Sequence, residues 1–157
     1  MLAFNHVKGR FNYRTAGVLM RQQEVLVHRA ENEPFWTLPG GRVEFGESAQ
    51  AGLARELHEE LGVVAAVDRL LWAVENFFTY QEQRYHELAF YFLAALPGDS
   101  AAYAATTPFH GYEPGTTLIF QWYPLANLSS LELYPSFLRQ GLQALPASTT
   151  YVVHRDG

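Results

Sequence analysis

Three glutamates close together are the residues of this sequence best suited to chemistry. Glu56, Glu59 and Glu60 lie within five consecutive positions. On a helix that turns about 100° per residue, Glu60 would lie about 40° to one side of Glu56 and Glu59 about 60° to the other. The three carboxylates would thus share one face of the helix, which we call the acidic stripe. Like charges at this spacing repel one another, so a cation is expected to neutralise the acidic stripe. Carboxylate oxygens suit Mg²⁺, or alternatively Mn²⁺, especially when substrate phosphates complete the coordination.

The stripe needs a docked helix to hold it, and the surrounding residues predict one. In 49–61 an apolar residue recurs every four positions, and Gly62 follows as a stop signal. Either Glu47 or Ser48 is expected to cap its start. Gly52 lies one turn before Glu56 and has two interpretations. It either leaves space above the stripe for a metal or diphosphate, or it lets a neighbouring strand approach closely.

The other segments predict a mixed sheet packed between helices, an α/β fold in a single domain over 1–157. A second helix is expected at 135–145 and a tail at about 146–157. The segment 98–115 is expected to be either a lid or a disordered loop. Strands are expected at 11–20 and 24–29, which form a hairpin, and at 36–38, 42–45, 63–67, 70–80, 84–96 and 116–123.

Composition and charge exclude several classes of protein. Hydrophobic residues make up 48% of the 157 residues, which is enough to fill a core and excludes a largely disordered chain. No apolar run approaches the ~20 residues that span a bilayer, and Met1–Lys8 lacks the apolar core of a signal peptide. The net charge of −5 argues against nucleic acid and anionic membranes as partners. With no cysteine, a reducing, cytoplasmic location is expected.

The segment 41–63 carries a spaced motif. It runs from Gly41 through five residues to Glu47, then seven residues to the sequence RELHEELGV at 55–63. This resembles the Nudix hydrolase signature at every specified position. The preceding 36–40 and the later 122–125 with Leu128 are similar to family segments more loosely. The resemblance implies an α/β/α sandwich with a mixed central sheet.

The resemblance also implies a reaction. Nudix hydrolases cleave the phosphoanhydride of a nucleoside diphosphate linked to another moiety, so the expected partner is a nucleotide-type small molecule. The residues matching Glu56 and Glu60 bind the metal, the one matching Glu59 assists or acts as the base, and the carbonyl matching Gly40 completes the site. The arginine matching Arg55 pairs with the residue matching Glu47. Family members are often dimers, so a homodimer is possible.

Candidates outside the motif come from the residues themselves. A base from outside the helix would be Glu87, which interrupts an apolar strand, or the weaker candidate Glu113. Aromatic side chains suit stacking with a nucleobase, and arginines suit the phosphate or sugar. The aromatic candidates are Phe77, Phe78, Tyr80, Tyr85, Tyr103, Phe109 and Tyr112, with Phe78 foremost, and the arginines are Arg14, Arg42 and Arg84.

Two alternative functions are carried by the same fold. A regulatory Nudix domain binds a nucleotide sugar without cleaving it, but such domains usually lose glutamates that this chain keeps. An isomerase of the same fold, such as the isopentenyl diphosphate type, resembles chemistry that uses a cysteine, and this chain has none. Metal-dependent hydrolysis by an activated water is therefore the preferred interpretation.

Overall fold

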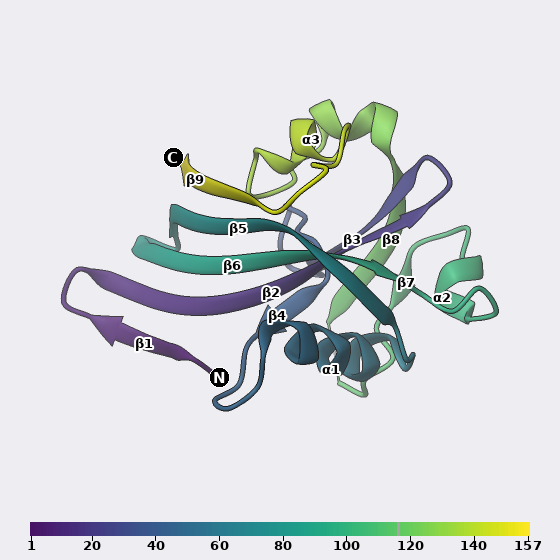
Figure 1. Ribbon diagram of the computed structural model, residues 1–157, viewed down its shortest axis with the longest axis horizontal. Helices are drawn as coiled ribbons and strands as arrows, with labels where there is room; N and C mark the ends of the chain where they lie inside the picture. The colour runs from purple at the N-terminus through teal and green to yellow at the C-terminus, as the bar shows by residue number, and fades with distance from the viewer. Residues whose placement is uncertain (116) are drawn as a thin grey trace.

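A mixed sheet forms the centre of the molecule (Figure 1). The computed structural model describes residues 1–115 and 117–157, and these contain nine strands in one sheet. The strand order is β7-β8-β3-β2-β6-β5-β9, with β1 and β4 paired to β2 outside this path. The strands are β1 (Ala3–His6), β2 (Gly9–Arg21), β3 (Glu24–Ala30), β4 (Gly40–Arg42), β5 (Ala66–Tyr80), β6 (Gln83–Ala95), β7 (Phe109–His110), β8 (Leu118–Pro124) and β9 (Thr150–Asp156). The β2–β6 and β5–β9 pairs are parallel and the others antiparallel, which confirms the predicted mixed sheet.

Helical segments cover both faces of the sheet, as the sandwich prediction requires. In Figure 1, α1 (Ala49–Leu61) lies below the sheet, and η1 (Leu125–Ser130) and α3 (Leu138–Gly141) lie above it. Leu53 and Leu57 of α1 are fully buried in one core cluster. A second cluster on the other face includes Leu128 and Leu138. Among the described residues, no helix is long and apolar enough to cross a membrane.

Helix α1 spans 49–61, as its four-residue apolar repeat predicts. Ser48 caps it, because its Oγ accepts a hydrogen bond of 3.1 Å from the backbone N–H of Ala51. The helix ends at Gly62, whose left-handed φ of 68° lets its N–H donate to the carbonyl of His58. This helix is the element that carries all three glutamates of the stripe.

The C-terminal segment corrects one prediction. Residues 150–156 are not a tail but form β9, which pairs in parallel with β5 over seven residues. The run Thr-Thr-Tyr-Val-Val at 149–153 has the β-branched and aromatic character of a strand. Pairing also satisfies the backbone groups along the otherwise open edge of β5.

Two further segments differ from expectation. The predicted second helix shortens to the four residues of α3, where Gly141 weakens a helix but lets the chain pack closely. A Cβ at this position would lie 3.2 Å from the Trp72 ring. The segment 98–115 is not a free loop, because it contains α2 (Ala101–Ala104) and β7. The indole of Trp122 donates to the carbonyl of Ala102, which ties α2 to the core.

Most of the remaining strand predictions hold with shifted boundaries, and the strand expected at 84–96 forms β6. The strand expected at 36–38 does not form, because Trp36 and Thr37 make only isolated bridges. The hairpin at 11–20 and 24–29 forms as β2 and β3, and the two segments 63–67 and 70–80 merge into the single bulged strand β5. The short strand expected at 42–45 forms at 40–42 instead. Of the strand expected at 116–123, residue 116 lies outside the described residues and 118–124 form β8. Strand β1 was not predicted, because it is only four residues long.

Candidate active site

A clamp between Arg55 and Glu47 fixes α1 to the loop that precedes it. The Nε and Nη2 atoms of Arg55 donate to the two carboxylate oxygens of Glu47 at 3.0 and 2.7 Å. The hydrogen bonds from Arg55 hold the pKa of Glu47 below its usual value. Arg55 Nη2 also donates to the carbonyl of Arg42, at 3.2 Å. A planar guanidinium thereby ties helix, loop and strand β4 together.

Glu56 packs directly against Gly41, at the start of the motif. A Cβ at Gly41 would lie 2.4 Å from the Glu56 carboxylate carbon, so only glycine leaves room for this side chain. Glu56 also accepts a hydrogen bond from Arg55 Nη1, at 3.0 Å. Burial raises the pKa of Glu56 despite this contact. The preceding residue, Gly40, is similarly constrained, since a Cβ there would lie 2.1 Å from the carbonyl oxygen of Thr15.

Glu60 is the most unusual acid of the site. Only 6% of the residue is exposed, and among the described residues neither carboxylate oxygen has a hydrogen-bond partner. Burial, and secondly the charge of Glu56, raise the pKa of Glu60 to about 8. His28 Nδ1 lies 3.8 Å away, too far for a hydrogen bond, and burial lowers the pKa of His28 to about 3. The pair is therefore two neutral groups at pH 7, not an ion pair.

Glu59 is the exposed member of the stripe. Its side chain is 46% exposed, and its two oxygens lie 3.3 and 3.4 Å from Nη1 of Arg55. Because Arg55 contacts both Glu56 and Glu59, the stripe is partly neutralised from within the protein. Among the described residues no three acidic or histidine side chains are already arranged around a metal position.

The donor set nevertheless fits a divalent cation. Buried polar oxygens are normally hydrogen-bonded, and two unpartnered oxygens on one carboxylate require a ligand or a proton. Glu60 supplies these oxygens, and the half-buried carboxylate of Glu56 lies near enough to raise its pKa. Hard oxygen donors of this kind match Mg²⁺ and Mn²⁺.

Gly52 serves close packing. A Cβ at Gly52 would lie 2.9 Å from Oε1 of Glu47 and 3.5 Å from the Thr15 side chain on β2. The space above Gly52 is therefore filled by the Glu47 carboxylate and a neighbouring strand, which supports the second of the two interpretations. The glycine lets the Arg55–Glu47 clamp lie flat against α1.

Glu87 lies in a network with two asparagine amides. It is buried on β6, and its two oxygens accept hydrogen bonds from Asn12 Nδ2 at 2.5 Å and Asn76 Nδ2 at 3.5 Å. The Oδ1 of Asn76 is buried and has no partner among the described residues. All three residues of this network line one cavity.

The cavity that contains Glu87 has a volume of about 720 Å³. Arg14 and Arg42 line it. The charge of Arg14 acts on Glu56 and Glu60, although burial outweighs it and raises both pKa values, so this end adjoins the acidic stripe. Phe78 and Tyr85 also line it, with parallel rings whose centroids are 4.9 Å apart. Tyr80 lines the same wall.

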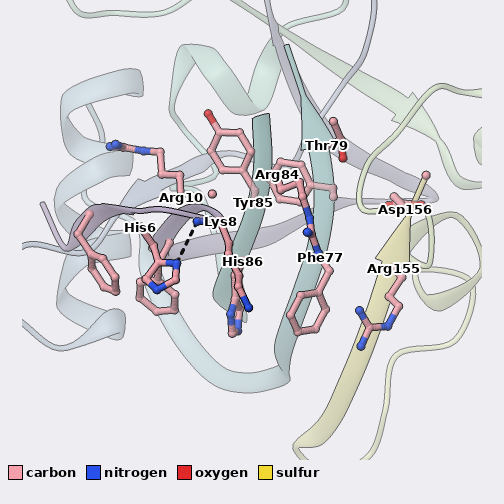
Figure 2. Close-up of a pocket in the computed structure, with 15 residues that line it drawn as sticks. His6, Lys8, Arg10, Phe77, Thr79, Arg84, Tyr85, His86, Arg155 and Asp156 are labelled. Atoms are coloured by element: carbon pink, nitrogen blue, oxygen red, sulfur yellow. Dashed lines mark hydrogen bonds between the residues drawn. The ribbon is translucent and has the colours of Figure 1, made fainter. Parts of the chain in front are cut away.

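Other predicted residues lie elsewhere. Arg84 does not line this cavity but a neighbouring one of about 690 Å³, shown in Figure 2. Phe77 lines that second cavity as well. Tyr103 packs edge-on against Trp122, and Phe109 stacks on Phe120, so both are parts of the core.

His28 was not predicted from the sequence as a site residue, and Tyr112 was predicted only as a group for stacking with a nucleobase. His28 faces Glu60 from β3, and nothing in its apolar strand distinguishes it from an ordinary core residue. Tyr112 lies beside the end of α1, where its N–H donates to the carbonyl of Glu60 at 2.5 Å. This contact brings the weaker candidate Glu113 near the stripe, and the charge of Glu113 helps to raise the pKa of Glu60.

Comparison with known proteins agrees with the fold and identifies the family. The family model described as the NUDIX domain matches residues 12–145. The chain therefore belongs to the Nudix hydrolase family.

Individual relatives are more distant. A putative 8-oxo-dGTP diphosphatase of Bacillus subtilis is 33% identical over 84 residues, which are 54% of this chain and 52% of that protein. An RNA pyrophosphohydrolase of Haemophilus ducreyi is 26% identical over 74% of this chain and 66% of its own length. The chain thus spans about half the length of the first relative. A crystal structure of an ADP-ribose pyrophosphatase from Streptococcus suis has a TM-score of 0.60 at 16% identity, covering 90% of this chain and 98% of that one, and shows the shared fold.

Proposed function

We propose that this protein is a metal-dependent pyrophosphohydrolase that cleaves the phosphoanhydride of a nucleoside diphosphate linked to another moiety. The observation that carries the proposal is the buried Glu60 carboxylate, whose two oxygens have no hydrogen-bond partner in the described part of the chain. It lies beside Glu56, which fills the space left by Gly41, and we call this space the glycine cradle. A buried unpaired acid is costly, and it is common where a protein uses the group chemically. Relatives named as diphosphatases and pyrophosphohydrolases support the same reaction class.

Glu56 and Glu60 would hold Mg²⁺, or Mn²⁺ in its place, with the Gly40 carbonyl as a further ligand. When bound, the cation would neutralise the phosphates and lower the pKa of a coordinated water towards neutrality. Arg55 would act as a positioning residue and would not take part in the reaction itself. It holds Glu47 with two hydrogen bonds and so keeps α1 in register with the loop of Gly40 and Gly41.

The base that accepts the proton of the attacking water should be a glutamate with accessible oxygens. Glu59 is the first candidate, because it is the most exposed acid of the stripe. Glu113 is the second, because its charge acts on Glu60. Glu87 accepts hydrogen bonds from two asparagines and lies on the cavity wall, which favours contact with substrate donors over proton transfer.

The substrate would lie in the 720 Å³ cavity. Arg14 and Arg42 lie at the end near the acids and suit the phosphate groups. Phe78 and Tyr85 form a stacked pair on the wall and suit a nucleobase. This order of cationic and aromatic groups supports a nucleotide as the substrate class.

A nucleotide panel tests the proposal. Release of phosphate, pyrophosphate or nucleoside monophosphate would be measured for nucleoside triphosphates, ADP-ribose, dinucleoside polyphosphates and 5′-triphosphorylated RNA, each with Mg²⁺ or Mn²⁺. Glu60→Gln should abolish turnover, whereas the matched variant Glu82→Gln, in the exposed β5–β6 turn, should not change it. Tight binding of a nucleotide with no turnover on any member would instead support a regulatory binding domain.

A further inference from the structure

Five side chains form a continuous row across one face of the sheet, near the β1–β2 and β5–β6 turns. Strand pairing places Phe4 opposite Phe11, Phe11 opposite His86, His86 opposite Phe77, and Phe77 opposite Arg155. Directly opposed residues project to the same face of a sheet. Their contacts are close, with ring centroids 5.1, 5.5 and 4.6 Å apart and Arg155 Cζ 4.4 Å from the Phe77 centroid. We call these five residues the aromatic row.

Exposure alternates along the aromatic row. Phe4 is 56% exposed, and His86 and Arg155 are exposed as well, whereas Phe11 and Phe77 are half-buried. Figure 2 shows His86, Phe77 and Arg155 leaving three neighbouring strands on the same side. Two phenylalanines therefore support three accessible planar groups, which is a surface on which other planar groups can stack.

Cations surround the aromatic row without acidic partners. Lys8 and Arg84 line the same cavity, which has a volume of about 690 Å³. Among the described residues, the side chains of Lys8, Arg84 and Arg155 form no ion pair with an acid. Asp156 is an acid that lines the cavity too, and it contacts His154 and accepts hydrogen bonds from Ser136. The patch is thus locally basic in a chain whose net charge is −5.

The charge identifies the kind of occupant. In a two-fold dimer through this patch, the same surface would face itself, so Arg84 and Arg155 would meet cations on the other copy. A polyanion avoids that repulsion. A polyanion that also carries planar groups would use both the cations and the exposed rings, and single-stranded nucleic acid has this combination in its phosphates and bases.

We propose that the aromatic row and its cations bind a short segment of single-stranded nucleic acid, with bases on Phe4, His86 and Arg155 and phosphates near Lys8 and Arg84. This site is separate from the acidic stripe, so it goes beyond the proposed hydrolysis. The negative net charge predicts no nucleic-acid partner, but net charge does not report how cations are distributed over the surface.

Fluorescence anisotropy tests this site without any contribution from catalysis. The probe is a labelled single-stranded RNA of about eight nucleotides with a 5′ hydroxyl end, in EDTA at low salt. A DNA of the same sequence forms the second arm, because stacking and phosphate contacts serve both. Variants Phe4→Ala and His86→Ala remove stacking groups, and Arg84→Gln and Arg155→Gln remove cations. Matched controls are Phe45→Ala, an 89% exposed phenylalanine elsewhere, and the exposed Arg69→Gln.

We expect each stacking variant to weaken binding by about five- to a hundredfold, and each arginine variant to weaken it and lower the salt slope by about one. The controls should bind like the unchanged protein, and inorganic polyphosphate should compete poorly because it has no bases.

Absence of binding at low salt, equal losses in the controls, or polyphosphate binding as tight as RNA would each overturn the proposal. So would a dimer that Phe4→Ala dissociates, or binding of anionic phosphatidylserine vesicles without binding of RNA or DNA. Binding of RNA without hydrolysis of any nucleotide would leave this proposal standing and count only against the proposed function.

Discussion

His28 Nδ1 and Glu60 Oε1 lie 3.8 Å apart in the protein interior, and neither group is charged at neutral pH when no metal is bound. Burial explains both states, because desolvation disfavours the protonated imidazole and the ionised carboxylate alike. A cation bound by Glu60 would stabilise the ionised carboxylate and so offset the free-energy cost of its desolvation. The neutral imidazole beside it would add no positive charge to compete with that cation.

The first prediction concerns the stability of the metal-free protein. Glu60 has a folded pKa of about 8 against 4.5 for the unfolded chain, so the folded state binds the extra proton between these values. His28, with its pKa lowered to about 3, opposes this effect only below its unfolded pKa of 6.5. Between pH 6.5 and 8 the change in stability therefore comes from Glu60 and not from His28, and the free energy of unfolding should fall by about 1–2 kcal/mol. Urea unfolding in EDTA at a series of pH values measures this free energy.

The control for that prediction is Glu60→Gln, which should remove most of the decline between pH 6.5 and 8. Adding Mg²⁺ to the unchanged protein should oppose the decline, since metal ligands must be deprotonated. A pH-independent stability of the unchanged protein in EDTA would contradict the buried, neutral state of Glu60.

The second prediction tests the glycine cradle. In Gly41→Ala the new Cβ would meet the Glu56 carboxylate at 2.4 to 2.6 Å. Because the far end of a flexible side chain can move, stability should change little, whereas Glu56 should be displaced and Mg²⁺ affinity should drop by about 10–100-fold. Isothermal titration with Mg²⁺ measures the affinity. Gly98→Ala, with open space around it, should leave affinity unchanged, and equal effects in the two variants would count against the cradle.

The third prediction concerns the clamp. Arg55→Lys keeps the charge but loses the two-pronged contact with Glu47, so it should destabilise the protein by about 1–3 kcal/mol. Glu47→Gln should cost a similar amount. A double-mutant cycle by chemical denaturation should show that the combined loss is smaller than the sum. Strictly additive losses would mean that the two side chains act independently.

The fourth prediction separates the candidate bases. If Glu59 accepts the proton, Glu59→Gln should lower kcat by about 10²–10⁴-fold and remove the acidic limb of the pH–rate profile. Glu113→Gln should have a smaller effect on kcat. Glu87→Gln should mainly raise KM, because its carboxylate lies on the cavity wall. Loss of the acidic limb in Glu87→Gln, but not in Glu59→Gln, would reverse the assignment.

Local patterns in the sequence determined the helix and its chemistry. The four-residue repeat places Leu53 and Leu57 in the core and so orients Glu56 and Glu60 on the adjoining stripe. The spacing of helical residues is fixed by backbone geometry, which is why α1 was predicted to the residue. The resemblance of 41–63 to the Nudix signature implied the Arg55–Glu47 contact, which the structure contains.

Tertiary structure alone decided which distant residues meet this helix. His28 comes to Glu60 from β3, and Tyr112 comes to its backbone carbonyl from the segment after β7, because strand order and loop path set these contacts. The strand β9 and the aromatic row depend on registers between strands far apart in sequence. Such pairings depend on which edges and faces remain free after the sheet assembles, and no local pattern encodes that choice.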